Sequence, residues 1–391
     1  MSSQKQNILF ISHRASRSGA PALLLGIIKE IKKQRNLSFR ILLLLDGELS
    51  GEFKALGKTF IWKRRPNEKK TLIAKVFRRL SGISDEIRRR YIIFQLRNTT
   101  TVFSNTITTG ELQEKLLPSG ARFICYVHEM EMAIREATTA RLLEVVLKKT
   151  NLFLTGSNAV KHNLISGHQI NPDSIHIQYY PIPVSVHNKK DYTAVKHSFS
   201  ERNNIPPDAV IIGVAASSEW RKGFDLFLPM IKLYLNLFPN SNAYFVWMGL
   251  KDNHLPSTLN LYDDCKKYGL GNRAILVPHG NEYMNHMACF DIHLLLSRED
   301  PYPLVVLDAA GFGIPTICFE NAGGTPEFVE NDCGYSVPYG DLFAMARKLN
   351  ALVADPVLRM EMGHNAKEKV QRKHNYQKQT QEIIKLIETS A

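Results

Sequence analysis

DIHLLLSREDPYPLVVLDAAGFGIPTICFENAGGTPEFVE, residues 291–330, is the stretch that decides the fold of this 391-residue chain. Residues 292–296 are an apolar run of strand length that ends in a polar, acidic cluster. A helical pattern follows over 304–312, with Pro303 where a helix would begin, and residues 316–319 form a second short strand. Thr325-Pro326-Glu327 has the capping hydroxyl, proline and acid of another helix start. The stretch therefore predicts strand, acidic loop, helix, strand, glycine loop and helix.

Two strand ends of this stretch are candidates for a ligand site, because open parallel sheets bind ligands at the carboxyl ends of their strands. N–H groups at the helix starts near Pro303 and Thr325 are suited to an anion such as a diphosphate. Asp300 lies before the first helix and Asp308 about one and a half turns into it, so both are expected to face one cleft. The simpler alternative is a helix-capping Asp300 and a solvated Asp308.

The pattern around these acids resembles the C-terminal signature of retaining glycosyltransferases of family 4, an E-x7-E motif followed by G-x-P and a glycine-rich loop. Here both acids are aspartates, and Glu299 competes with Asp300 for the first role. The resemblance covers nearly the whole chain and implies an α/β fold of the GT-B kind, with two facing Rossmann-like doubly wound domains and an interdomain cleft. Residues 1–185, with a C-terminal helix at 375–391 packed back on them, would take the acceptor. Residues 186–374 would bind the nucleotide sugar.

The composition is that of a globular chain long enough for two domains, with 44% hydrophobic and 22% charged residues. No apolar run approaches the ~20 residues of a membrane helix, and the N-terminus lacks the apolar region of a secretory signal. Five scattered cysteines without metal-ligand spacing indicate reduced thiols and predict a cytoplasmic protein. No cluster of ligating residues argues for a metal, so neither a metal nor another cofactor is expected.

The net charge of +13 is concentrated between Lys58 and Arg97, where thirteen Lys/Arg and three acids leave a balance of +10. Such a patch suits nucleic acid, anionic lipid or phosphorylated substrates. Apolar residues recur at helical spacing between the charges from Leu72 to Leu80, the pattern of a basic amphipathic helix. An anionic membrane surface is the predicted partner, with the protein peripheral on the cytoplasmic face, and nucleic acid is not expected. A solvated face, or a helix packed on its own domain, is the alternative.

Polar residues also follow the strands predicted in the first half. Strand 7–12 leads through a basic loop into a helix, the unit that binds phosphate in doubly wound folds, although G-x-G-x-x-G is absent. SGAPALLL resembles the family loop near the donor diphosphate, which assigns Gly19 and Ala20 to the donor. His128, after strand 123–127, matches the position of a histidine beside the donor sugar. The remaining polar residues at strand ends are assigned to the acceptor side: His13, Arg14, Asn105 and Asn158.

In the second half, the loop after strand 210–215 carries Lys222 directly before a glycine. The resemblance implies that its ammonium neutralises the leaving diphosphate. The family's partner arginine is missing, since that position is Ala216, and Arg221 is the candidate substitute. The resemblance assigns ribose anchoring to Asp308. The predicted catalytic residues are His128, Lys222 and Asp300, and the donor-binding set is Gly19, Ala20, Ser217, Arg221, Lys222, Glu299, Pro303, Leu304, Val305 and Asp308.

The predicted function is metal-independent transfer of a sugar from a nucleotide-sugar donor to a saccharide or lipid-linked acceptor, with retention, in cell-surface polysaccharide synthesis. One alternative is a nucleotide-sugar epimerase on the same architecture, which would need further acids and histidines at the sugar ring. The other is a catalytically silent nucleotide-sugar-binding subunit of a glycosyltransferase complex. The aspartates in place of glutamates and the missing arginine are the reasons to keep that second alternative open.

Overall fold

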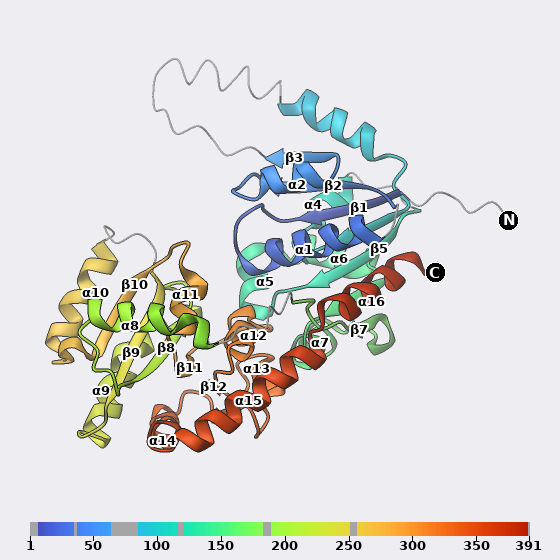
Figure 1. The fold of residues 1–391 in the computed structure, drawn as a ribbon. Helices are drawn as coiled ribbons and strands as arrows, with labels where there is room; N and C mark the ends of the chain where they lie inside the picture. The colour runs from blue at the N-terminus through green and yellow to red at the C-terminus, as the bar shows by residue number, and fades with distance from the viewer. Residues whose placement is uncertain are drawn as a thin grey trace, which may run out of the picture. The chain divides into compact units, whose positions relative to one another are not determined.

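A computed structural model describes residues 7–34, 37–63, 85–115, 120–182, 189–250 and 256–389 (Figure 1). The chain divides into two compact units, Met1–Pro181 with Tyr376–Ala391 (unit 1) and Ile182–Asn375 (unit 2). Each unit has its own parallel sheet, which confirms the predicted fold class of two Rossmann-like doubly wound domains. The domain boundary predicted near residue 185 falls outside the described residues.

The sheet of unit 1 has the strand order β3-β2-β1-β4-β5-β6-β7 in the described part of the chain. All its neighbours are parallel, and Ile8 of β1 pairs with Phe39 on one side and Thr101 on the other. Its inner strands are nearly continuous apolar runs, as expected for strands buried on both faces. The strands are β1 (Asn7–Ser12), β2 (Ser38–Leu45), β3 (Thr59–Lys63), β4 (Thr101–Ser104), β5 (Arg122–Val127), β6 (Leu152–Thr155) and β7 (Ile175–Ile177).

The helices of unit 1 include the last helix of the chain, α16, which runs beside α1 (Figure 1). The Tyr376 hydroxyl at the start of α16 donates to the Gly26 carbonyl of α1 at 2.6 Å. At the other end of α16, the Arg122 guanidinium donates to the Leu386 carbonyl at 2.8 Å. The helices are α1 (Gly19–Gln34), α2 (Ser50–Leu56), residues 85–96, α4 (Gly110–Lys115), α5 (Glu131–Ala137), α6 (Ala140–Lys149), α7 (Asn158–His168) and α16 (Tyr376–Glu388).

The sheet of unit 2 has the strand order β10-β9-β8-β11-β12-β13, again parallel throughout the described residues. Every residue of β8 is buried. The strands are β8 (Val210–Ala215), β9 (Ala243–Leu250), β10 (Ala274–Pro278), β11 (Ile292–Leu295), β12 (Thr316–Phe319) and β13 (Gly334–Val337). The helices are α8 (Thr193–Arg202), α9 (Phe227–Leu237), α10 (Pro256–Lys267), α11 (Tyr283–Ala288), α12 (Leu304–Gly311), α13 (Thr325–Val329), α14 (Leu342–Ala354) and α15 (Pro356–Lys373).

Each sheet has one point where the strand order reverses, between β1 and β4 in unit 1 and between β8 and β11 in unit 2. Ligands of doubly wound folds bind beside such a point, outside the carboxyl ends of the strands. In unit 1 the loops there begin at residues 13 and 105, and in unit 2 they begin at residues 216 and 296. Most of the predicted site residues lie in these four loops.

Three local predictions need correction. Residues 59–63, counted in the basic segment, form the edge strand β3, whose Phe60 and Trp62 are buried. Pro303 is the cap of α12, in extended conformation, rather than its first residue. Thr325 is the first residue of α13 rather than its cap, and among the described residues its buried hydroxyl has no hydrogen-bond partner. The helix predicted at 71–80 lies outside the described residues.

Candidate active site

The centre of the site in unit 2 is an ion pair between Lys222 and Asp300. The Lys222 Nζ lies 2.5 Å from Asp300 Oδ2, and the Ser297 hydroxyl donates to the same oxygen at 3.1 Å. The side chains are only 18% and 7% exposed. Lys222 ends the 3₁₀ turn Trp220–Lys222 after β8, and Asp300 follows β11. The switch point of the sheet therefore brings together two predicted catalytic residues.

Two glycines allow the loops around this pair to approach so closely. Gly223 has φ +75°, and a side chain there would collide with the Leu296 carbonyl. Gly323 has φ +127°, and a side chain there would collide with the Asp300 carbonyl. The Asp300 amide also donates to the Ala322 carbonyl at 2.7 Å. The glycine-rich loop after β12 thus holds the backbone of the acidic loop in place.

Arg221, the candidate substitute for the missing arginine, supports the backbone of the acidic loop. Its Nη1 donates to the Glu299 carbonyl at 2.8 Å, and its own carbonyl accepts from the Arg298 amide at 2.8 Å. Glu299 itself is buried. Ser217 lies partly exposed just after β8. The contacts of Arg221 are those of a residue that positions the loop carrying Asp300.

Asp308 lies on α12 and accepts a hydrogen bond at 2.8 Å from the hydroxyl of Tyr283, on α11. Burial raises the pKa of the Asp308 carboxyl to about 6, against the opposing effect of this hydrogen bond. Before it on the chain, Pro303 is buried, while Leu304 and Val305 in the first turn are partly exposed. Sequence reasoning missed Tyr283, because its partner lies 25 residues away on another helix.

In unit 1 the structure brings together Ala20, Asn105 and His128. The His128 Nε2 lies 2.8 Å from Asn105 Oδ1, and the Asn105 Nδ2 donates to the Ala20 carbonyl at 2.7 Å. The His128 Nδ1 lies 3.0 Å from the hydroxyl of Tyr180, a residue that the sequence did not single out. Asn105, predicted on the acceptor side, is completely buried, with both ends of its amide hydrogen-bonded.

The surroundings of His128 keep its imidazole uncharged. Burial, and then the neighbouring His13, lower the pKa of His128 to about 3. Burial and the adjacent Arg14 likewise lower the pKa of His13 to about 4, and its buried Nδ1 has no hydrogen-bond partner among the described residues. Glu129, also missed, accepts hydrogen bonds from the His128 and Ile107 amides and the Thr106 hydroxyl, and burial raises its pKa.

Three other predicted residues of unit 1 lie at its surface. Gly19 is exposed at the start of α1, and Arg14 is exposed in the loop before it. Asn158 is exposed in the first turn of α7. Gly19 and Ala20 belong to unit 1, whereas the other predicted donor-binding residues belong to unit 2.

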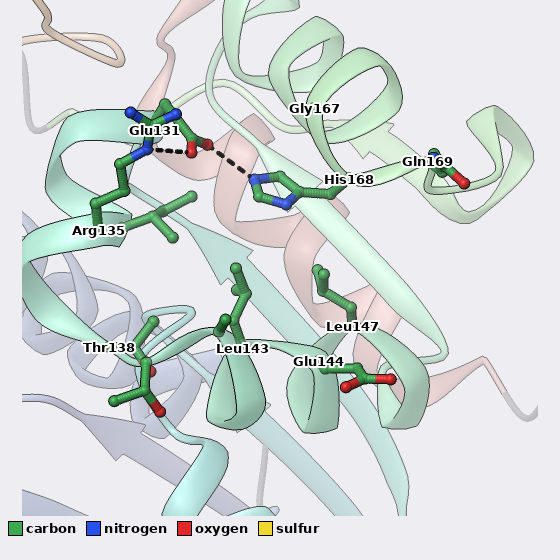
Figure 2. Close-up of a pocket in the computed structure, with 12 residues that line it drawn as sticks. Glu131, Arg135, Thr138, Leu143, Glu144, Leu147, Gly167, His168 and Gln169 are labelled. Atoms are coloured by element: carbon green, nitrogen blue, oxygen red, sulfur yellow. Dashed lines mark hydrogen bonds and ion pairs between the residues drawn. The ribbon is translucent and has the colours of Figure 1, made fainter.

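A separate cavity of about 560 Å³ lies between α5, α6 and α7 in unit 1 (Figure 2). The Glu131 carboxylate on its wall binds the Arg135 guanidinium at 2.7 Å and the His168 imidazole at 3.0 Å. None of the predicted site residues lines this cavity. Within the described ranges, no group of three or more His, Cys, Asp or Glu could hold a metal ion.

Two parallel-sheet α/β units with these switch points define the class of GT-B glycosyltransferase folds. The crystal structure of HepE from Anabaena, in complex with UDP and glucose, matches with a TM-score of 0.77 over 98% of this chain and 99% of that one, at 15% identity. Residues 195–369 match the family described as glycosyl transferases group 1. Unit 2 therefore contains a glycosyltransferase group 1 domain.

Two curated relatives are similar over shorter segments. An uncharacterized glycosyltransferase of Haemophilus influenzae is 24% identical over 147 residues, which are 37% of this chain and 40% of the relative. The N-acetyl-alpha-D-glucosaminyl L-malate synthase of Bacillus anthracis is 25% identical over 216 residues, 54% of each chain. The chain thus spans 40% and 54% of the length of these relatives.

Proposed function

We propose that this protein is a retaining glycosyltransferase of family 4, which moves a sugar from a nucleotide-sugar donor to a saccharide or lipid-linked acceptor in cell-surface polysaccharide synthesis. The observation that carries the proposal is the Lys222–Asp300 pair, at the switch point of the group 1 domain. The helix that follows the acidic loop carries Asp308. A cation and two carboxylates around one strand end are the groups that a nucleotide sugar needs for its diphosphate, its sugar and its ribose.

In this proposal the Lys222 ammonium binds the diphosphate. It has three N–H donors, and Asp300 takes one of them. The other two can donate to the oxygens of the leaving diphosphate as negative charge develops on them. Such an interaction is typically worth ~3–4 kcal/mol in a water-poor site. Both hydrogen bonds to the Asp300 carboxylate go to Oδ2, so among the described residues Oδ1 remains for a sugar hydroxyl.

The chemical step that we propose needs no nucleophile from the protein. The bond between the anomeric carbon and the diphosphate breaks, and the acceptor oxygen bonds to the same face of the sugar. The acceptor proton passes to the leaving phosphate oxygen, which gives the glycoside and a nucleoside diphosphate. HepE was solved with UDP and glucose, so UDP-glucose is the first donor to test.

We further propose that the transfer is metal-independent, with Lys222 and the first N–H groups of α12 neutralising the diphosphate. Turnover is then expected to be unchanged by EDTA. Abolition by EDTA, with recovery on addition of Mg²⁺ or Mn²⁺, would contradict this part of the proposal.

A panel of UDP-, GDP-, ADP- and dTDP-sugars, incubated with the protein and followed by proton NMR, separates the alternatives. A glycosyltransferase is expected to hydrolyse its donor slowly to nucleoside diphosphate and sugar, with the first-formed sugar in the donor's anomeric configuration. An epimerase would instead give a new nucleotide sugar, and a silent subunit would give no product. Lys222→Ala is expected to lower hydrolysis at least about a hundredfold. Lys196→Ala, which breaks the ion pair with Asp291 at the amino end of β11, is the matched control.

The proposed partner surface is an anionic membrane, reached through the helix at residues 85–96 in unit 1. Ile92 and Leu96 are buried on its inner side, while Ile87, Tyr91 and Phe94 are 64%, 52% and 56% exposed on its outer side. Arg90 is exposed beside them and the Arg97 guanidinium lies 3.6 Å from the centre of the Phe94 ring. Exposed apolar residues at helical spacing with arginines between them suit the interface of an anionic bilayer.

Among the described helices none is long and apolar enough to cross a bilayer, so binding would be at the surface of the membrane. The wild-type protein is expected to co-sediment with vesicles that contain phosphatidylglycerol and not with neutral vesicles, less so at high salt. Ile87→Ser with Phe94→Ser should weaken this binding. Val357→Ser with Met360→Ser, at two equally exposed apolar residues of α15, is the control and should not. Equal binding by both variants, or no binding by the wild type, would exclude the helix at residues 85–96 as the membrane-binding surface.

A further inference from the structure

A continuous chain of hydrogen bonds crosses the switch point of unit 1. It runs from the Tyr180 hydroxyl through the His128 ring and the Asn105 amide to the Ala20 carbonyl, with donor–acceptor distances of 3.0, 2.8 and 2.7 Å. Tyr180 lies two residues before the chain enters unit 2 at Ile182. Ala20 lies in the first turn of α1. These hydrogen bonds thus link the segment where the polypeptide leaves unit 1 to the end of the loop that follows β1.

The donor and the acceptor of each hydrogen bond can be assigned by starting from the Ala20 carbonyl. The Ala20 carbonyl can only accept, so the Asn105 amide presents its NH₂ group there and its Oδ1 to His128. That oxygen can also only accept, so the proton of the ring is on Nε2. A neutral ring then accepts at Nδ1 from the Tyr180 hydroxyl. Both nitrogens of His128 are occupied in one defined tautomer.

The groups packed around the ring do not favour a proton on Nδ1. Burial, and then the neighbouring His13 in the loop after β1, lower the pKa of His128 to about 3, and Arg14 in turn lowers the pKa of His13. The Tyr126 ring, on β5, lies 4.5 Å from the His128 ring between centroids. The adjacent Glu129 carboxylate is engaged with the His128 and Ile107 amides and the Thr106 hydroxyl.

We propose that His128 is a positioning residue, a permanently neutral Nε2–H imidazole that holds the first turn of α1 through Asn105, rather than a group that transfers protons. The backbone N–H of Asn105 also donates to the Ile11 carbonyl of β1 at 2.9 Å. Asn105 therefore holds both ends of the β1–α1 loop, Ile11 through its backbone and Ala20 through its side chain. The bearing of this role on catalysis rests on the proposed glycosyl transfer, but its first test does not.

Long-range ¹H–¹⁵N NMR of the histidine rings in the wild-type protein reads the tautomer directly. The His128 signals, identified by their loss in His128→Gln, are expected to be those of a neutral ring with the proton on Nε2, unchanged from pH 5 to pH 8. Ordinary exposed imidazoles, whose pKa is about 6.5, titrate over this range and serve as the internal reference. A proton on Nδ1, or a His128 ring that titrates between pH 5 and pH 8, would overturn the proposal.

Kinetics then separate positioning from proton transfer, provided that donor hydrolysis is detected. His128→Phe is expected to lower kcat roughly ten- to a hundredfold, because the loop loses its support. His128→Gln, whose amide can again donate to Asn105, should recover most of that loss and keep the pH profile of the wild type. No recovery, together with a lost limb of the pH profile, would indicate acid–base catalysis. Absence of hydrolysis in the wild type would contradict the proposed function and leave the NMR result decisive for His128.

Discussion

The two ends of strand β11 each carry a lysine–aspartate ion pair, and the two pairs differ in how much of the carboxylate they use. At the amino end, Lys196 Nζ lies 2.8 Å from both oxygens of Asp291, and the Ile211 amide donates to one of them at 2.9 Å. At the carboxyl end, Lys222 and Ser297 both bind only Oδ2 of Asp300. Both oxygens of the first carboxylate are thus hydrogen-bonded within unit 2, whereas among the described residues Oδ1 of the second has no hydrogen-bond partner.

Burial makes the contrast sharper. The side chains at the amino end are 35% and 19% exposed, those at the carboxyl end 18% and 7%. Taking charges out of water costs free energy that the attraction within a pair often fails to recover. The more buried pair is therefore poorly explained by stability, and better explained by the chemistry of a site at the switch point. The pair at the amino end anchors α8 to the edge from which β11 starts.

Lys222→Ala should have the largest effect of any change that tests this contrast. In the proposed mechanism, loss of the ammonium removes ~3–4 kcal/mol of charge stabilisation from the leaving diphosphate, so kcat should fall roughly one hundred- to one thousandfold with the fold intact. Lys196→Ala should leave kcat within about threefold of the wild type, since its ion pair with Asp291 lies at the opposite end of β11 from Lys222. Steady-state hydrolysis of the donor measures both. A Lys222→Ala variant with more than about a tenth of wild-type kcat would remove Lys222 from the site.

Asp308→Ala is expected to act on nucleotide affinity. Hydrogen bonds from ribose hydroxyls to a carboxylate are worth about 1.5–3 kcal/mol each, so the Kd of UDP should rise at least tenfold. Isothermal titration with UDP provides the measurement, and Asp291→Ala at the amino end is the control. An unchanged Kd would mean that Glu299 or another acid anchors the nucleotide.

Asp308→Asn and Asp291→Asn should change stability in opposite directions at pH 7.5. The pKa of Asp308 is about 6 in the folded state and 3.8 as the ordinary value, so the folded state binds more protons between these values. The free energy of unfolding of the wild-type protein therefore falls as pH rises from about 4 to 6. The neutral asparagine avoids that loss and should stabilise by on the order of 1 kcal/mol at pH 7.5, but little at pH 4.

Asp291→Asn instead removes a charged acceptor from Lys196 and the Ile211 amide, and should destabilise by on the order of 1 kcal/mol. Urea unfolding of both variants at pH 4 and pH 7.5 tests the pair of expectations. A destabilised Asp308→Asn at pH 7.5 would show that the carboxylate contributes to the fold rather than to a ligand site.

Tyr283→Phe should have the smallest effect, visible in its pH dependence. The Tyr283 hydroxyl stabilises the charged form of Asp308, so its removal raises the pKa of Asp308 further above about 6. UDP affinity should weaken roughly threefold at pH 6 and hardly at pH 8.5, where the carboxylate is ionised in either protein. Tyr234→Phe, which removes a hydroxyl bonded to Ser241 and Asn350 elsewhere in unit 2, is the control. An equal loss at both pH values would contradict the proposed effect on Asp308.

The sequence predicted the order of elements around the acidic loop well, because short-range pattern decides it. Strand, helix and strand over 292–319 were confirmed as β11, α12 and β12. Buried parallel strands are apolar runs, and proline or glycine marks where they give way to helices. Strand β3 escaped prediction since its five residues lie in a basic segment, and only pairing with β2 makes them a strand.

The sequence by itself thus determined the alternation of strands and helices. This alternation places Lys222, Asp300 and His128 in loops that follow strands. What only the tertiary structure decided is which groups meet. Lys222 and Asp300 are 78 residues apart and form a pair because β8 and β11 are neighbours in the sheet. The two nitrogens of His128 are likewise occupied by groups from two other strand ends. Such contacts depend on strand order and register, which are set by the packing of the whole sheet and leave no local pattern in the sequence.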